Sequence, residues 1–312
     1  MRILFFGSPD FAVPTLHALS ASRHTVVGVV TQPDRPRGRG QHVSRGAVAA
    51  AADALGVPVR QPVKLSEPGV PEALAAWGAD LGVVAAYGKI LPDWLLALPP
   101  AGMVNVHASL LPRYRGAAPV HRAVMAGEPV TGVTIMRVVR ALDAGPMLDR
   151  IVVTIGPAAT SAEVERMLGS AGAELLVTVV DRLAVGPVPE TPQDDEAATY
   201  AAKITREDSP VDWRRSAQAI HDQIRGLHPW PHASSRLGGQ RVILHRSVRV
   251  EGAFSTGAGS ILAAGPAGID VVAGDGAVVR LVELQAEGGR RLSVADFLSG
   301  RALTPGSAFE AM

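Results

Sequence analysis

The sequence contains no cysteine in its 312 residues. Disulfides, thiolate zinc sites and cysteine nucleophiles are therefore excluded, and the absence fits a reducing compartment. Lysine is scarce as well, because 27 of the 30 basic residues are arginines. Against 29 acidic residues the formal net charge is +1, which by itself neither favours nor excludes a polyanionic partner.

Long apolar runs are also missing. Residues 94–112 carry no formal charge, but Pro99, Pro100 and the polar Asn105 and His107 make this stretch unfit to cross a bilayer. Only four apolar residues follow Arg2 before Gly7, so the apolar region of a secretory signal is lacking. We therefore expect a cytoplasmic protein without a membrane partner.

The length of the chain suggests two domains. Residues 1–150 alternate short apolar segments with helical patterns. We expect strands at 2–7, 25–31, 58–62, 80–86 and 102–107, and helices at 9–21, 45–56, 71–78 and 92–98. This alternation predicts an α/β fold with a doubly wound, mostly parallel, Rossmann-like sheet, in which ligands bind at the carboxyl ends of the strands.

The next part of the chain completes this domain. We expect a helix at 119–127, a hairpin of strands at 132–139 and 147–155, and a long helix at 161–184 that begins at Thr160 or Ser161. Residues 186–199 are rich in proline and acidic residues and lack apolar periodicity, which is typical of a linker. The predicted organisation is a catalytic domain at 1–187, a linker at 188–206 and a second domain at 207–312.

The second domain has a different pattern. A helix at 216–226 precedes five short strands separated by glycine, and a final helix at 293–299 begins with a serine cap. The strands are expected at 233–237, 241–250, 259–263, 269–273 and 277–284. This pattern predicts a small β-barrel of the oligonucleotide-binding (OB) type.

Two polar clusters are candidates for chemistry. Gly7-Ser8-Pro9-Asp10 lacks the three spaced glycines of a dinucleotide site, so we interpret it as a structural turn. Asn105 and His107 alternate along a predicted strand and project from the same face. An amide stabilises an oxyanion and an imidazole transfers protons, although both side chains could instead satisfy local hydrogen bonds.

A third polar residue, Asp143, lies in another predicted turn. An amide, an imidazole and a carboxylate together suit the transfer of a one-carbon acyl group to an amine. The spacing alone does not show whether Asp143 meets His107.

At this point the motifs carry a family resemblance. Residues 105–112 (NVHASLLP), followed by 115–119 (RGAAP) and by Leu142-Asp143, resemble the signature of the folate-dependent formyltransferases. Residues 7–12 (GSPDFA), 31–36 (TQPDRP) and 228–231 (HPWP) are similar to the branch that acts on methionyl-tRNA. The similarity extends in order over nearly the whole chain.

The resemblance implies an enzyme that transfers the formyl group of 10-formyltetrahydrofolate to the α-amino group of initiator methionyl-tRNA. It assigns catalysis to Asn105, His107 and Asp143, without a metal. It assigns folate binding to Ser109, Leu110, Leu111 and Pro112.

The resemblance also places Arg39 in an inserted loop that reads the acceptor end of the tRNA. Residues 31–48 carry four arginines against one aspartate, a local charge of +3 that suits phosphate contacts. We expect a monomer. Two alternatives remain open: a formyltransferase acting on a nucleotide-linked amino sugar, and a non-catalytic RNA-binding protein on the same scaffold.

Overall fold

The computed structural model describes residues 1–37, 42–299, 303 and 307–310. The chain divides into two compact units, each discontinuous in sequence. The first comprises Met1–Pro119, Val130–Thr154 and Glu165–Ala201, and the second comprises Val120–Pro129, Ile155–Val164 and Ala202–Met312. The last division falls inside the segment expected to be a linker, and the domain boundaries given above stay a prediction.

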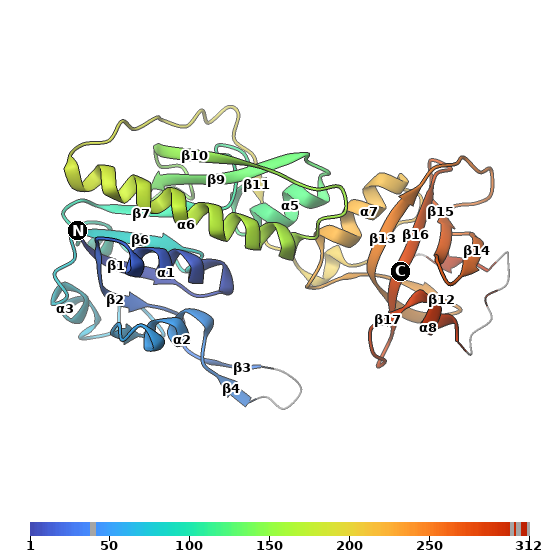
Figure 1. Cartoon of the computed structure of the whole chain (residues 1–312), viewed down its shortest axis with the longest axis horizontal. Helices are drawn as coiled ribbons and strands as arrows, with labels where there is room; N and C mark the ends of the chain where they lie inside the picture. Colours follow the sequence, from blue (N-terminus) through green and yellow to red (C-terminus); the bar gives the residue numbers. More distant parts are fainter. Residues whose placement is uncertain (38–41, 300–302, 304–306, 311–312) are drawn as a thin grey trace. The chain divides into compact units, whose positions relative to one another are not determined.

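The first unit is built on a seven-stranded sheet of order β10-β9-β7-β6-β1-β2-β5 (Figure 1). Five strands are parallel, β9 runs antiparallel to β7, and β10 forms a hairpin with β9. The mostly parallel sheet and its hairpin are therefore confirmed. The strands are β1 Arg2–Gly7, β2 Thr25–Val30, β5 Val59–Arg60, β6 Leu81–Ala85, β7 Met103–His107, β9 Val130–Arg137 and β10 Met147–Thr154.

The helices of this part agree with the sequence pattern to within a few residues. The helix expected at 9–21 begins as a 3₁₀ turn, because the Ala12 N–H bonds the carbonyl of Pro9 at 3.0 Å. The elements are η1 Asp10–Ala12, α1 Val13–Ala21, α2 Ala47–Ala54, α3 Val70–Ala75, α4 Asp93–Leu96 and α6 Ser161–Val185. Two two-stranded sheets complete the first unit. Strand β3 Arg35–Arg37 is antiparallel to β4 His42–Ser44, and β8 Arg115–Gly116 is parallel to β11 Tyr200–Ala201.

Helices cover both faces of the sheet, which decides where its polar residues lie. Met103 belongs to a core cluster with Leu74 of α3 and Leu95 of α4. On the other face, Gly172 of α6 is so close to β7 that a Cβ atom would lie 2.9 Å from Val106. Because side chains alternate along a strand, Asn105 and His107 project from the α3 and α4 face, away from α6.

The second unit contains an antiparallel sheet of order β14-β15-β16-β13-β12-β18, with β17 paired to β16. Its two ends are joined, because the Ile261 N–H donates to Ser307 O and the Phe309 N–H to Gly259 O, both at 2.8 Å. The sheet thus curls into a small barrel, as predicted. Its strands are β12 Ala233–Leu237, β13 Gln240–Val250, β14 Ile261–Gly265, β15 Gly268–Val272, β16 Val278–Ala286, β17 Leu292–Ser293 and β18 Phe309–Glu310.

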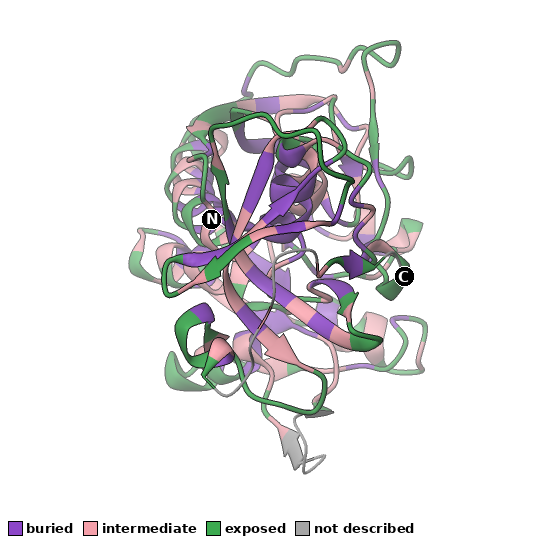
Figure 2. Cartoon of the chain, turned by 90° about the vertical axis from the view of Figure 1, so that its right-hand side faces the viewer, coloured by how far each residue is buried: buried purple, intermediate pink, exposed green. Residues whose placement is uncertain are grey.

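Serine caps begin two helices of this unit. The Ser216 hydroxyl accepts from the Ala219 N–H at the start of α7 Ala217–Gly226, and Ser293 does the same for Asp296 in α8 Val294–Leu298. Both caps confirm the helix starts expected from the sequence. Figure 2 shows buried residues concentrated on strands and exposed residues on the loops.

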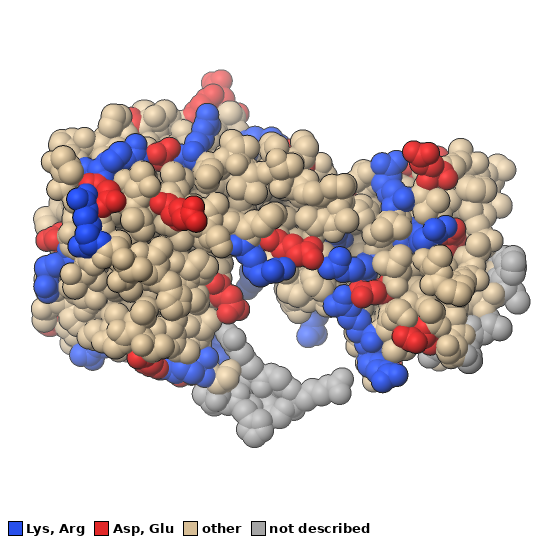
Figure 3. Space-filling view, in the orientation of Figure 1, with Lys and Arg blue, Asp and Glu red and all other residues tan. Residues whose placement is uncertain are grey.

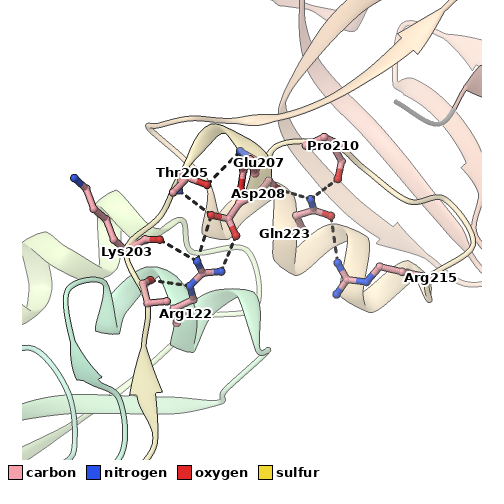
Figure 4. Close-up of polar contacts among 9 residues, drawn as sticks. Arg122, Lys203, Thr205, Glu207, Asp208, Pro210, Arg215 and Gln223 are labelled. Carbon is pink, nitrogen blue, oxygen red and sulfur yellow. Dashed lines mark hydrogen bonds and ion pairs between the residues drawn. The ribbon is translucent and has the colours of Figure 1, made fainter.

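Arg122 makes several of the contacts that join α5, Pro119–Met125, to other segments of the second unit. Its guanidinium donates to both carboxylate oxygens of Asp208, at 2.8 and 3.2 Å, and to backbone carbonyls of residues 202–203 (Figure 4). Gln223 of α7 donates to the Asp208 carbonyl at 2.9 Å. Although burial opposes it, the bonds and charge of Arg122 lower the pKa of Asp208. Arg122 therefore ties three segments together.

Charge is spread rather than segregated. Basic and acidic side chains are interspersed over the face shown in Figure 3, in keeping with the net charge of +1. In the part of the chain that the structure describes, no helix combines the length and the apolar character needed to cross a membrane.

A buried ion pair on α7 gives a test of the second unit. Asp222 and Arg225 are joined at 2.7 Å, with side chains only 3% and 6% exposed. Asp222→Ala leaves a buried guanidinium without its counter-charge, so we expect a loss of about 3–5 kcal/mol in the free energy of unfolding. Urea titration measures this loss, and hydrogen exchange of the α7 amides shows whether it is local to this helix. Asp212→Ala, which breaks an exposed pair with Arg214, is the control; equal effects of the two variants would contradict the argument.

Candidate active site

The carboxyl end of β7 carries the polar pair predicted from the sequence. Pairing with the antiparallel β9 places Asn105 opposite Met136 and His107 opposite Thr134. His107 is buried, at 5% exposure, and Asn105 is half-buried. Asn105 is the only asparagine of the chain, and within the described residues nothing hydrogen-bonds its side chain. Its amide is therefore available to a bound molecule.

The tautomer of His107 is set by the backbone. Its Nε2 lies 3.0 Å from the carbonyl oxygen of Tyr114. A carbonyl only accepts, so Nε2 carries the hydrogen and Nδ1 is the nitrogen left to exchange a proton. Nδ1 lies 3.7 Å from Oδ2 of Asp143, which is too far for a direct hydrogen bond but within ion-pair distance. The structure thus brings Asp143 to His107.

Asp143 is held in an uncommon backbone conformation. Its φ of +47° lies in the left-handed region, and Oδ2 accepts the Gly116 N–H at 2.8 Å. The following turn requires glycine at position 145, since a Cβ atom there would lie 1.9 Å from the carbonyl oxygen of Arg137. The carboxylate is therefore fixed toward the imidazole.

Gln193 is a positioning residue that sequence analysis missed. Its Nε2 donates to the carbonyls of Asp143 and Gly145, at 2.8 and 2.7 Å. Its Oε1 accepts from Nε of the buried Arg115 at 3.0 Å, and Arg115 in turn pairs with Asp195 at 2.7 Å. Gln193 and Asp195 lie in the segment expected to be a linker, where the lack of apolar periodicity gave no signal of a role in a site.

In the segment predicted to bind folate, two residues are buried and hold the loop in place, and two are partly exposed. Ser109 and Leu111 are buried: the Ser109 hydroxyl donates to Arg113 O at 2.7 Å, and the Leu111 N–H donates to the Thr134 hydroxyl at 3.2 Å. Leu110 and Pro112 are half-buried. Contact with a ligand at these four positions stays a prediction. Arg39, predicted to contact tRNA, lies outside the described residues.

Comparison with known proteins decides the family. Residues 1–180 match the formyl transferase family, and residues 203–302 match the formyl transferase C-terminal domain. A methionyl-tRNA formyltransferase of Citrifermentans bemidjiense is 46% identical over 98% of this chain and 95% of its own length. One of Thiobacillus denitrificans is also 46% identical, over 98% of this chain and 99% of its own. The chain belongs to the methionyl-tRNA formyltransferase family.

Solved structures with lower identity share the fold. An N-formyltransferase from Helicobacter canadensis, in complex with folinic acid and dTDP-3-aminofucose, aligns with a TM-score of 0.67 at 15% identity, covering 90% of this chain and 98% of its own. HypX from Aquifex aeolicus, in complex with tetrahydrofolic acid, aligns at 0.64 and 18% identity over 96% of this chain and 47% of its own. The fold of this chain is therefore shared with proteins outside the methionyl-tRNA formyltransferases.

Gln193→Ala tests the positioning network of this formyltransferase. The change releases the turn that holds Asp143, so we expect kcat for formyl transfer to fall on the order of tenfold to a hundredfold, with KM nearly unchanged. Steady-state kinetics separate the two constants. The matched control is Gln240→Ala, an exposed glutamine of β13. A change in KM alone would show that Gln193 does not position the carboxylate.

Proposed function

We propose that this chain transfers the formyl group of 10-formyltetrahydrofolate to the α-amino group of initiator methionyl-tRNA, with Asn105, His107 and Asp143 as its catalytic residues. One observation carries the proposal: Nδ1 of His107 faces the Asp143 carboxylate at 3.7 Å, while Nε2 is anchored on Tyr114. An imidazole with one anchored nitrogen and one beside a carboxylate is suited to move a proton.

The relatives favour this substrate over the two alternatives. The proteins that match almost the whole chain at 46% identity are named methionyl-tRNA formyltransferases. The likeness to the formyltransferase bound to an amino sugar nucleotide is at 15% identity and supports the fold alone. A non-catalytic RNA-binding role gives no reason for His107 and Asp143 to face each other.

The first step is attack of the neutral amine on the formyl carbon. A free α-amino group has a pKa near ~8, so a useful fraction is unprotonated near neutral pH. Attack forms a carbon–nitrogen bond and places negative charge on the formyl oxygen. The Asn105 amide donates to this oxygen, which is the interaction that strengthens most as the charge develops.

The second step removes a proton from the attacking nitrogen and breaks the bond to the folate nitrogen. Nδ1 of His107 takes the proton, directly or through a bridging water, and the Asp143 carboxylate stabilises the imidazolium. The same proton then passes to the leaving folate nitrogen, so the reaction is balanced without a metal. Because Nε2 stays on the Tyr114 carbonyl, only Nδ1 shuttles.

The folate co-substrate would lie against the loop after β7. Leu110 and Pro112 offer partly exposed apolar surface to its ring, whereas Ser109 and Leu111 hold the loop through buried contacts. Asn105 lies near the end of β7, just before this loop, and its unpartnered amide can donate to the formyl carbonyl of the folate co-substrate. Arg39 would contact tRNA phosphate from the inserted loop.

Alanine substitutions test the catalytic assignment. Asn105→Ala removes the oxyanion donor and His107→Ala removes the proton shuttle, so each is expected to lower turnover by about 10²–10³-fold. Transfer of labelled formyl from 10-formyltetrahydrofolate to charged initiator tRNA measures turnover, and a filter assay measures tRNA binding, which we expect to be nearly unchanged. The exposed His17→Ala is the control. Unchanged turnover in either active-site variant would refute its role.

Arg39→Ala tests the tRNA contact. Loss of one phosphate contact should weaken formylation at limiting tRNA and lower the slope of log affinity against log salt by about one. Titration of tRNA at several salt concentrations measures both effects. Arg150→Ala, an exposed arginine of β10, provides the matched loss of charge. If the two variants behave alike, Arg39 has no specific contact.

A further inference from the structure

Three histidines gather in the second unit and take no part in the chemistry described above. His228 and His232 lie in the loop between α7 and β12, and His245 lies on β13. The ring centroids are 5.2 Å apart for His228 and His232 and 4.4 Å apart for His232 and His245. One ring nitrogen from each of the three lies within 4.8 Å of the others.

The hydrogen bonds around His245 determine which of its nitrogens is open. Nε2 of Gln285 donates to the Gly289 carbonyl at 3.0 Å, so the amide presents Oε1 to His245. Nε2 of His245 lies 2.9 Å from that oxygen and must carry the hydrogen. Nδ1 of His245 therefore holds a lone pair, in a side chain that is 4% exposed.

The remaining nitrogens point to a ligand. In the described part of the chain, Nδ1 of His228, of His232 and of His245 is buried without a hydrogen-bond partner. Buried polar atoms are normally satisfied, so three such atoms in one cluster require an explanation. A single bound cation would satisfy them together.

The backbone of the loop after α7 fixes the position of the His232 ring. The His232 N–H bonds the carbonyl of Leu227, at the end of α7, at 3.0 Å. His232 itself has a φ of +66°, in the left-handed region that few residues adopt. The loop is thus folded back on the helix end, which turns His232 toward His245.

We propose that His228, His232 and His245 bind one Zn²⁺ ion, with solvent completing the coordination. Zinc binds imidazole nitrogen at about 2.0–2.1 Å in tetrahedral geometry, so the three nitrogens, now within 4.8 Å of one another, would converge on one ion. Three imidazoles without carboxylate or thiolate form a donor set suited to zinc rather than to magnesium or calcium. Gln285, whose Oε1 accepts from Nε2 of His245, would then orient this histidine toward the metal.

The electrostatic surroundings agree with this geometry. Burial lowers the pKa of all three histidines. Arg291 is a nearby cation, but its guanidinium is paired with Glu283, with Nε at 3.0 Å from Oε2. The pairing reduces its repulsion of a metal ion.

Bound zinc cross-links the loop after α7 to β13 and stabilises the barrel. This inference is independent of the formyl-transfer site. Formyl transfer itself needs no metal in the mechanism above.

Metal uptake by the full chain tests the proposal. The protein is stripped with a chelator, dialysed against ZnCl₂ and analysed for metal, and we expect about one zinc per chain. His228→Gln and His232→Gln are each expected to lower uptake to near zero, whereas the exposed His17→Gln is expected to retain it. These positions are only half-buried or exposed, and circular dichroism verifies that each variant is folded.

A thermal measurement gives an independent readout. Zinc should raise the melting temperature of the parent chain and of His17→Gln but not that of His228→Gln, because only a folded site gains binding energy. Mg²⁺ at the same concentration should have no effect. Failure of the parent chain to take up zinc, uptake that persists in both cluster variants, or equal stabilisation by Mg²⁺ would overturn the proposal.

Discussion

The site depends on one short stretch of backbone, residues 114–116. The carbonyl of Tyr114 accepts from His107, and the amide of Gly116 donates to Asp143, so the same three residues hold the imidazole and the carboxylate. His107 lies at a strand end and Asp143 in a distant turn, and no direct hydrogen bond joins them. Their separation is therefore set by the position of this stretch, which also leaves Nδ1 as the nitrogen that faces Asp143 and is proposed to exchange protons.

That stretch is in turn anchored by the segment that precedes the second unit. The Arg115 N–H donates to the Thr199 carbonyl at 2.8 Å, and β8 pairs in parallel with β11. Gln193 reaches from the same segment to the turn of Asp143. A segment that lacks any apolar periodicity thus provides the framework of the site through backbone and amide hydrogen bonds. Such contacts leave little trace in composition, because almost any sequence supplies the backbone donors and acceptors.

The elements of the fold were predictable because burial imposes a period on the sequence. Apolar runs on both faces marked the parallel strands, and alternation along β7 placed Asn105 and His107 on one face. The meeting of His107 with Asp143 was not predictable from spacing, since it depends on a turn with positive φ and on Gln193. The grouping of α5 with the second unit was equally hidden, because it depends on contacts between segments far apart in the sequence, such as those of Arg122 with Asp208 and of Met125 with Gly226.

Two histidine environments in this chain show how surroundings decide the chemistry of one side chain. His107 has one nitrogen on a carbonyl and the other beside a carboxylate, which is the basis of its proposed role in proton transfer. At His245 one nitrogen is on an amide oxygen, but the other faces two further imidazoles. Protonation there would bring positive charge into a buried cluster, so the rings stay neutral and their lone pairs are left for a metal. His107 and His245 are buried to a similar extent, at 5% and 4% exposure, so it is the partner of the second nitrogen that distinguishes their environments.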